Sequence, residues 1–152
     1  MSIDRSTQPG ADEKDAGSVN RVELSIPARP ELLFLARMTA AAVASRADFG
    51  YDQIEDLRLA LDELCLALLQ VPTTAGRLHL RLTWSEDAIE VAATLEDEDA
   101  PPHVLPLATA SSVPSPNELS ERILDALVDQ HGVDHRDGIT RSWLRMCRSR
   151  DR

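Results

Sequence analysis

Alternating apolar and polar residues predict five strands along the chain. In the segment RVELSI, Val22, Leu24 and Ile26 fall on one face, which is the pattern of a strand with one buried side. The segments RLHLRLTW and IEVAATL alternate in the same way, and the short SED between them predicts a hairpin. Asp137 and Gly138, between VDHR and ITRSWLRM, predict a second hairpin. The inward residues of the first hairpin would be Leu78, Leu80, Leu82, Trp84, Ile89, Val91, Ala93 and Leu95.

Apolar residues at steps of three and four predict two helices after the first strand. Pro30 stands at a suitable first helical position, and PELLFLARMTAAAVASRA predicts a helix that ends near Gly50. Asp52 and Glu55 have the spacing of a capping box at the start of the next helix. Pro72 would end this second helix. Its buried stripe would comprise Ile54, Leu57, Leu61, Leu64 and Leu68.

A third helix is predicted after a proline-rich loop at residues 97–117. Ser115 would cap it, Pro116 would be its first residue, and Glu118 would complete a capping box. Gly132 would close the helix. Its inward residues would be Leu119, Ile123 and Leu127. The order β-α-α-β-β-loop-α-β-β predicts an α+β fold, a two-layer sandwich in which three main helices cover one face of an antiparallel-rich mixed sheet.

Composition divides the chain and narrows its functional class. Residues 1–19 are polar and are predicted to be a disordered tail, followed by one domain at residues 20–148 and a short tail at 149–152. The net charge of −10 argues against direct contact with nucleic acid and suits binding to a basic protein. Cys65 and Cys147 are expected to be buried thiols of a reducing compartment. We find no secretory signal and no apolar run of membrane-spanning length, so the chain is predicted to be cytoplasmic, without a membrane partner.

Three stretches of the chain resemble one protein family in their amino-acid sequence and in their order along the chain. They are VELSIPARPELLFLARMTAAAV, DFGYDQIEDLRLALDELC and ERILDALVDQHGVDHRDGITRSWLRM. These stretches resemble the anti-sigma-factor kinases of the RsbW type, which belong to the GHKL or Bergerat-fold ATPases, the superfamily of histidine-kinase catalytic domains. The resemblance covers most of the chain from Arg21 to about Met146, and the second stretch is its most specific part.

The resemblance implies partners, cofactors and site residues. Proteins of this type bind an RNA polymerase sigma factor, act as homodimers, and use ATP and Mg²⁺ to phosphorylate a serine of a STAS-type anti-anti-sigma antagonist. By this resemblance Glu63 is the general base, Asp97 contacts adenine, and Arg37 contacts the partner protein, with Glu31 on the same face. The asparagine that ligates the metal corresponds to Ala67.

Several positions depart from the family pattern on the phosphate side. Ala67 has no oxygen for Mg²⁺. The DxGxG box corresponds to DEDAP, with Asp99 and Pro101 in place of its glycines, and the GxGL box corresponds to ELSE at residues 118–121. Glycines let backbone amides approach a phosphate closely, whereas carboxylates repel it. These departures predict that ATP and Mg²⁺ are not used.

The sequence therefore favours a sigma-factor-binding regulator over an enzyme. The alternative is an active serine kinase of the same type that uses ATP and Mg²⁺ through Glu63 and Asp97, and a third class is a scaffold without either partner. The alternative interpretation is that Glu63 and Asp97 are ordinary acidic residues of the solvent-exposed surface. In the same way, Arg37 can be interpreted as a solvated charge on a helix. Glu31 can be interpreted as an acid in the first helical turn that complements the helix dipole. No metal site is predicted.

Overall fold

The computed structural model describes residues 20–70, 76–97, 118–136 and 139–149. The elements are, in chain order, β1 (Asn20–Pro27), the short 3₁₀ helix η1 (Pro30–Leu32), α1 (Leu33–Arg46), α2 (Tyr51–Leu69), β2 (Gly76–Trp84), β3 (Ala88–Asp97), α3 (Glu118–Leu127), β4 (Gln130–Arg136) and β5 (Ile139–Cys147). This order matches the one predicted. The expected tail at residues 1–19 and the cap at Ser115 lie outside the described residues.

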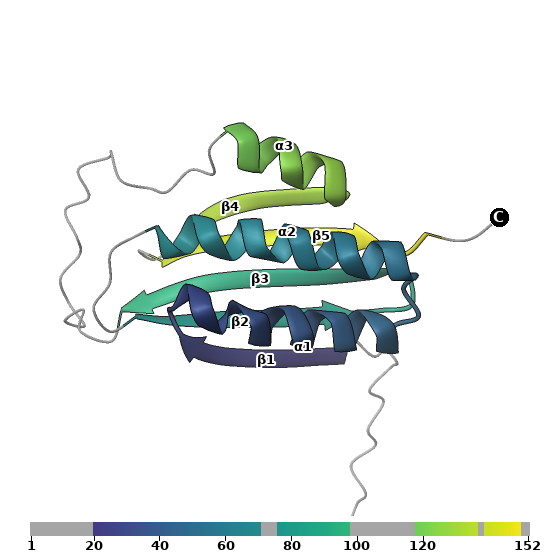
Figure 1. The fold of residues 1–152 in the computed structure, drawn as a ribbon, viewed down its shortest axis with the longest axis horizontal. Helices are drawn as coiled ribbons and strands as arrows, with labels where there is room; N and C mark the ends of the chain where they lie inside the picture. The colour runs from purple at the N-terminus through teal and green to yellow at the C-terminus, as the bar shows by residue number, and fades with distance from the viewer. Residues whose placement is uncertain (1–19, 71–75, 98–117, 137–138, 150–152) are drawn as a thin grey trace, which may run out of the picture.

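The strands form one five-stranded sheet in the order β1-β2-β3-β5-β4. All four pairs of neighbouring strands are antiparallel, so the parallel pairing implied by a mixed sheet does not occur among the described strands. Both predicted hairpins, β2–β3 and β4–β5, are confirmed. Antiparallel strands can leave one sheet face open to solvent, and here all three helices lie on the other face (Figure 1).

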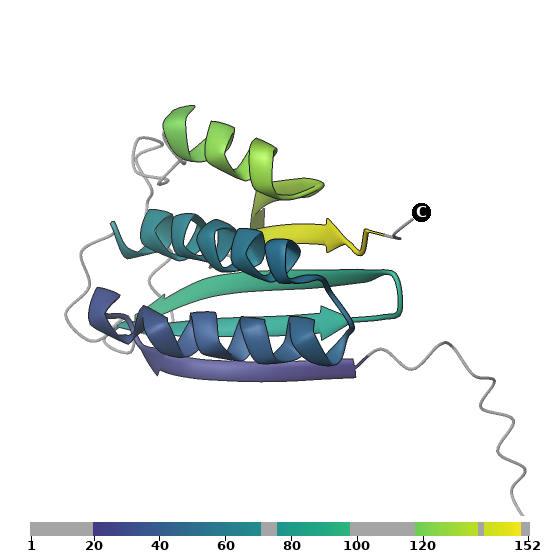
Figure 2. The same cartoon turned by 45° about the vertical axis from the view of Figure 1, so that its right-hand side comes forward.

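The helices form the second layer of the sandwich. Helices α1 and α2 pack side by side over the sheet, and α3 lies beside α2 and contacts β4 (Figure 2). The core between the layers contains the predicted stripe of α2 and the predicted inward faces of β2 and β3. The α+β sandwich is therefore confirmed. None of the helices within the described ranges is long and apolar enough to cross a membrane.

Two predicted helix signals are wrong because local sequence did not reveal the competing partners. Helix α2 begins at Tyr51 after an extended Gly50, without a side-chain cap, and Glu55 instead accepts a hydrogen bond of 2.7 Å from Arg58. In α3, the predicted inward residue Leu127 packs against the core, but Leu119 is 65% exposed and the buried residue is Leu124. The inward face of this helix is set by its position beside α2, which its own periodicity did not fix.

Gly132 is predicted to end α3, but in the structure it lies within β4. Its cross-strand partner is Trp143 of β5. A Cβ atom at Gly132 would lie 3.0 Å from the indole Cζ2 of Trp143. Glycine is therefore used here for a close approach between a backbone and an aromatic ring.

The turn between α1 and α2 contains a left-handed residue. Asp48 has a φ of 58°. The Phe49 N–H donates to the Ala44 carbonyl at 3.0 Å, and the Asp48 N–H donates to the Ser45 carbonyl at 3.3 Å. This pair of hydrogen bonds is a Schellman motif, in which the left-handed position is usually glycine. The side chain of Phe49 is buried, so the motif also anchors the turn to the core.

Replacing Asp48 by glycine should raise the free energy of unfolding by about 0.5 kcal/mol, because glycine adopts a positive φ without a Cβ clash. Urea denaturation checks this value. The matched control is Asp52→Gly in the first turn of α2, which should lower the free energy of unfolding by about 0.5–1 kcal/mol. A loss of stability in Asp48→Gly would mean that the Asp48 side chain stabilises the turn by more than its strained backbone costs.

Candidate functional site

Glu63 lies on α2, and its side chain is held by α3. The Ser120 hydroxyl donates a hydrogen bond of 2.8 Å to Glu63 Oε2. Both side chains are half-buried. The carboxylate is therefore not a fully solvated surface acid, since a hydroxyl of the same chain already occupies one of its oxygens.

The next turn of α2 lacks a metal ligand. Ala67 is 7% exposed and presents a methyl group, which supplies no oxygen for Mg²⁺. Within residues 20–70, 76–97, 118–136 and 139–149, no three His, Cys, Asp or Glu side chains are grouped as a metal site.

The start of α3 carries negative charge. Glu118 and Glu121 stand in its first turn, and both are exposed. These carboxylates occupy the end of the helix at which a phosphate would otherwise be attracted. Asp97 ends β3, but its side chain and residues 98–117 lie outside the described part of the chain. The expected adenine contact therefore stays a prediction.

Arg37 is paired with an acid on the neighbouring helix. Its Nη1 donates to both carboxylate oxygens of Asp62, at 2.8 and 3.0 Å. The two side chains are 33% and 27% exposed, so the pair is partly desolvated and ties α1 to α2. Glu31 is exposed in η1.

Helix α2 is linked to both of the other helices, through Asp62 to α1 and through Glu63 to α3. Successive residues of a helix point about 100° apart. Asp62 therefore reaches Arg37 on α1, while Glu63 reaches Ser120 on α3. Sequence reasoning missed the roles of Asp62 and Ser120, because each contact joins residues far apart in the chain and depends on how the helices pack.

The two cysteines differ in environment. Cys65 is buried on α2 with no exposed surface, and Cys147 is exposed at the end of β5. Burial, with a smaller effect from the Asp62 carboxylate, raises the pKa of the Cys65 thiol to about 12. The prediction of a buried thiol is confirmed for Cys65 and wrong for Cys147, because the last residue of β5 points away from the helical layer.

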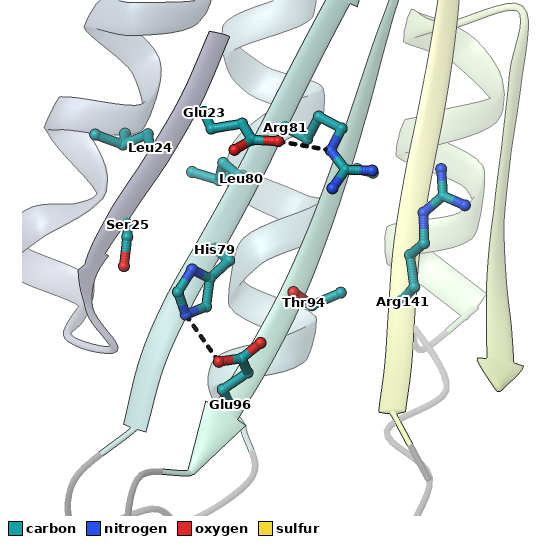
Figure 3. A pocket seen from close by; sticks show the side chains of 10 residues that line it. Glu23, Leu24, Ser25, His79, Leu80, Arg81, Thr94, Glu96 and Arg141 are labelled. Atoms are coloured by element: carbon teal, nitrogen blue, oxygen red, sulfur yellow. Dashed lines mark hydrogen bonds and ion pairs between the residues drawn. The ribbon is translucent and has the colours of Figure 1, made fainter. Parts of the chain in front are cut away.

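A shallow hollow of about 330 Å³ lies on the open face of the sheet (Figure 3). Its floor includes Thr94, and Arg141 stands at one side (Figure 3). His79 Nε2 on β2 lies 3.1 Å from Glu96 Oε2 on the neighbouring strand β3. The hollow is on the opposite side of the sheet from Glu63, so it is separate from the predicted nucleotide site.

Comparison with known proteins agrees with this architecture. Residues 26–147 match the histidine kinase-like ATPase domain. The serine-protein kinase RsbW of Bacillus velezensis is 30% identical over 135 residues, which cover 81% of this chain and 83% of that protein. RsbW of Bacillus subtilis (strain 168) is 30% identical over 131 residues, covering 78% of this chain and 81% of that protein. The chain therefore belongs to the histidine kinase-like ATPase family, as an RsbW-like member.

Proposed function

We propose that this chain is an anti-sigma factor that sequesters an RNA polymerase sigma factor by protein binding and releases it to an anti-anti-sigma protein. The observation that carries the proposal is an RsbW-like chain that has a buried alanine at position 67, where a metal ligand is expected. The protein acts in the cytoplasm as a homodimer and does not contact nucleic acid directly.

The phosphate side of the site supports binding without phosphoryl transfer. A kinase must neutralise the charge that spreads over the transferred phosphoryl group, mainly with Mg²⁺ and cationic or amide donors. Here Ala67 supplies no ligand, and Glu118 and Glu121 add negative charge at the start of α3. The described residues on this side of the site therefore favour a protein-binding role without ATP and Mg²⁺.

Arg37 and Glu31 form the partner-binding side of this proposal. Arginine is favoured at the centre of protein interfaces, where its planar group can donate several hydrogen bonds. Within the described residues, Arg37 donates to Asp62 only from Nη1. Its remaining N–H groups can therefore bind a partner while Asp62 holds the guanidinium in place.

Binding to the sigma factors of the same cell tests the proposal directly. We expect one of them to form a stable complex with the purified chain in isothermal titration calorimetry. Arg37→Ala should weaken this complex by about tenfold to a hundredfold. Arg46→Ala removes an exposed arginine of the same helix and serves as the control, with an unchanged affinity. If no sigma factor of that cell binds, the proposal is wrong.

The second candidate is an active serine kinase that uses ATP and Mg²⁺. The observation in its favour is that Glu63 accepts a serine hydroxyl at 2.8 Å, which is the distance a general base needs. An active kinase would bind the nucleotide and phosphorylate a serine of the antagonist protein. The Glu63→Ala variant would lose this phosphorylation.

We expect ATP with Mg²⁺, at millimolar concentration, to leave the melting temperature of the chain unchanged. A ligand that binds only the native state at a hundred times its Kd stabilises the protein by about 2.7 kcal/mol. Differential scanning fluorimetry detects such a shift. A rise in the melting temperature with ATP, absent with the same concentration of inorganic phosphate, would support the kinase instead.

A further inference from the structure

Exposed apolar side chains gather on the outer surface of α1 and α2. Phe34 is 43% exposed and Met38 is 65% exposed on α1, while Leu59 is 55% exposed and Leu66 is 41% exposed on α2. Single exposed apolar residues need no explanation, but a contiguous group of large ones marks an interaction site.

Helix geometry brings these side chains onto one surface. Phe34 and Met38 are four residues apart, and Leu59 and Leu66 are seven apart, so each pair lies along one side of its helix. The two helices pack side by side as an antiparallel hairpin (Figures 1 and 2). The Arg37–Asp62 pair crosses between them at 2.8 Å. Along α1 Arg37 lies between Phe34 and Met38, and along α2 Asp62 lies between Leu59 and Leu66, so the apolar residues precede and follow the ion pair on both helices.

The helical layer that carries this surface has a net negative charge, although two of its acids, Asp62 and Glu55, are paired with Arg37 and Arg58. Residues 30–70, which contain η1, α1 and α2, carry seven Asp or Glu residues against three Arg residues. The first turn of α3, next to α2, adds Glu118 and Glu121. Charge complementarity thus favours a partner with positive side chains around an apolar stripe.

We propose that Phe34, Met38, Leu59 and Leu66, here called the outer helical patch, bind an amphipathic helix of a partner protein whose apolar stripe is flanked by Lys and Arg. A helix docks in this way by placing residues at i, i+3, i+4 and i+7 against an apolar surface. The basic flanks of such a helix are attracted by the net negative charge of the helical layer, which accelerates association. That the partner is a sigma factor rests on the proposed function, whereas the chemistry of the docked helix rests on the patch.

A designed peptide tests the patch without any sigma factor. The probe is a helical peptide of leucine and lysine with an amphipathic pattern, and the matched probe has glutamate in place of lysine. We expect the lysine peptide to bind and to shift the amide NMR signals of α1 and α2, and the glutamate peptide not to bind. Binding of both peptides, or shifts confined to the strands, would overturn the proposal.

A double variant, Leu59→Ser with Leu66→Ser, separates apolar contact from charge attraction, because every charge is kept. It should weaken peptide binding by about tenfold or more, equivalent to about 1.4 kcal/mol. Leu119→Ser removes another exposed leucine, on α3, and should change the affinity by less than about twofold. Circular dichroism checks that each variant is folded. Unchanged affinity in the double variant would show that the patch is not the docking site.

The same variants distinguish this proposal from the proposed function. If a sigma factor binds equally well to the wild-type chain and to the double variant, the outer helical patch is not its docking site, but the anti-sigma function stands. If the peptide binds and no sigma factor does, the patch is supported and the proposed function fails. Light scattering reports the oligomeric state, and conversion of a dimer to a monomer by the double variant would assign the patch to a second copy of the chain, which overturns the proposal.

Discussion

Only the Cys147 thiol should react with an aromatic disulfide reagent in the native protein, and Cys65 should react only after unfolding. Cys147 is exposed, whereas Cys65 has no exposed surface and a pKa of about 12. Since the thiolate is the nucleophile, burial and a raised pKa both suppress the reaction. Absorbance of the released aromatic thiol should show one equivalent in buffer and two in denaturant.

Two variants assign the reacting thiol. Cys147→Ser should release no aromatic thiol under native conditions and one equivalent in denaturant. Cys65→Ala should release one equivalent under both conditions. Rapid labelling of Cys65 in folded Cys147→Ser would contradict the packing of α2 against the sheet.

The same buried thiol makes stability depend on alkaline pH. The folded-state pKa of Cys65 is about 12, above its ordinary value of 9.0, so folding favours the protonated thiol. Above pH 9 the unfolded chain binds fewer protons than the folded one, and the free energy of unfolding falls as the pH rises towards 12. The loss should reach about 2–3 kcal/mol at pH 11. Urea titrations at a series of pH values measure it.

Cys65→Ala removes the titrating thiol and controls for the other groups of the protein. At neutral pH its free energy of unfolding should be lower than that of the wild type, because removal of the sulfur leaves a small cavity. It should then fall less steeply between pH 9 and pH 11 than that of the wild type. Parallel pH profiles for the two proteins would show that Cys65 does not remain protonated in the native state.

Patterns with a period of two or between three and four predicted most of the fold. The alternation at Leu78, Leu80 and Leu82 and the stripe through Leu57 and Leu61 are confirmed, because burial on one face of an element repeats along the chain itself. Such a pattern states which face of an element is buried and needs no knowledge of the neighbouring element.

Several of the predictions that failed depended on a distant neighbour. Gly132 resembled a helix terminator, yet its small size serves Trp143 on the next strand. Leu119 fitted an apolar stripe, but the placement of α3 beside α2 leaves it exposed. In the candidate site, Glu63 was found from the resemblance, whereas Ser120 was not, since ELSE contains no local sign of a contact across the helical layer.

Asparagine at position 67 should destabilise the protein by about 2–4 kcal/mol. Ala67 is 7% exposed, so the larger side chain overpacks the site and buries an amide without an assigned partner. Leu66→Asn places the same side chain one position earlier, at a 41% exposed site, and should cost less than about 1 kcal/mol. Urea denaturation of the two variants measures the difference.

Nucleotide added to Ala67→Asn then tests why the site departs from the family pattern. If the missing metal ligand were the only defect, ATP with Mg²⁺ would restore stability to this variant and not to Leu66→Asn. We expect no recovery, because Glu118 and Glu121 still repel phosphate and Glu63 is still engaged by Ser120. An ATP-dependent rise in the melting temperature of Ala67→Asn would show instead that one methyl group separates this chain from a nucleotide-binding protein, and would overturn the view that several residues jointly exclude the cofactor.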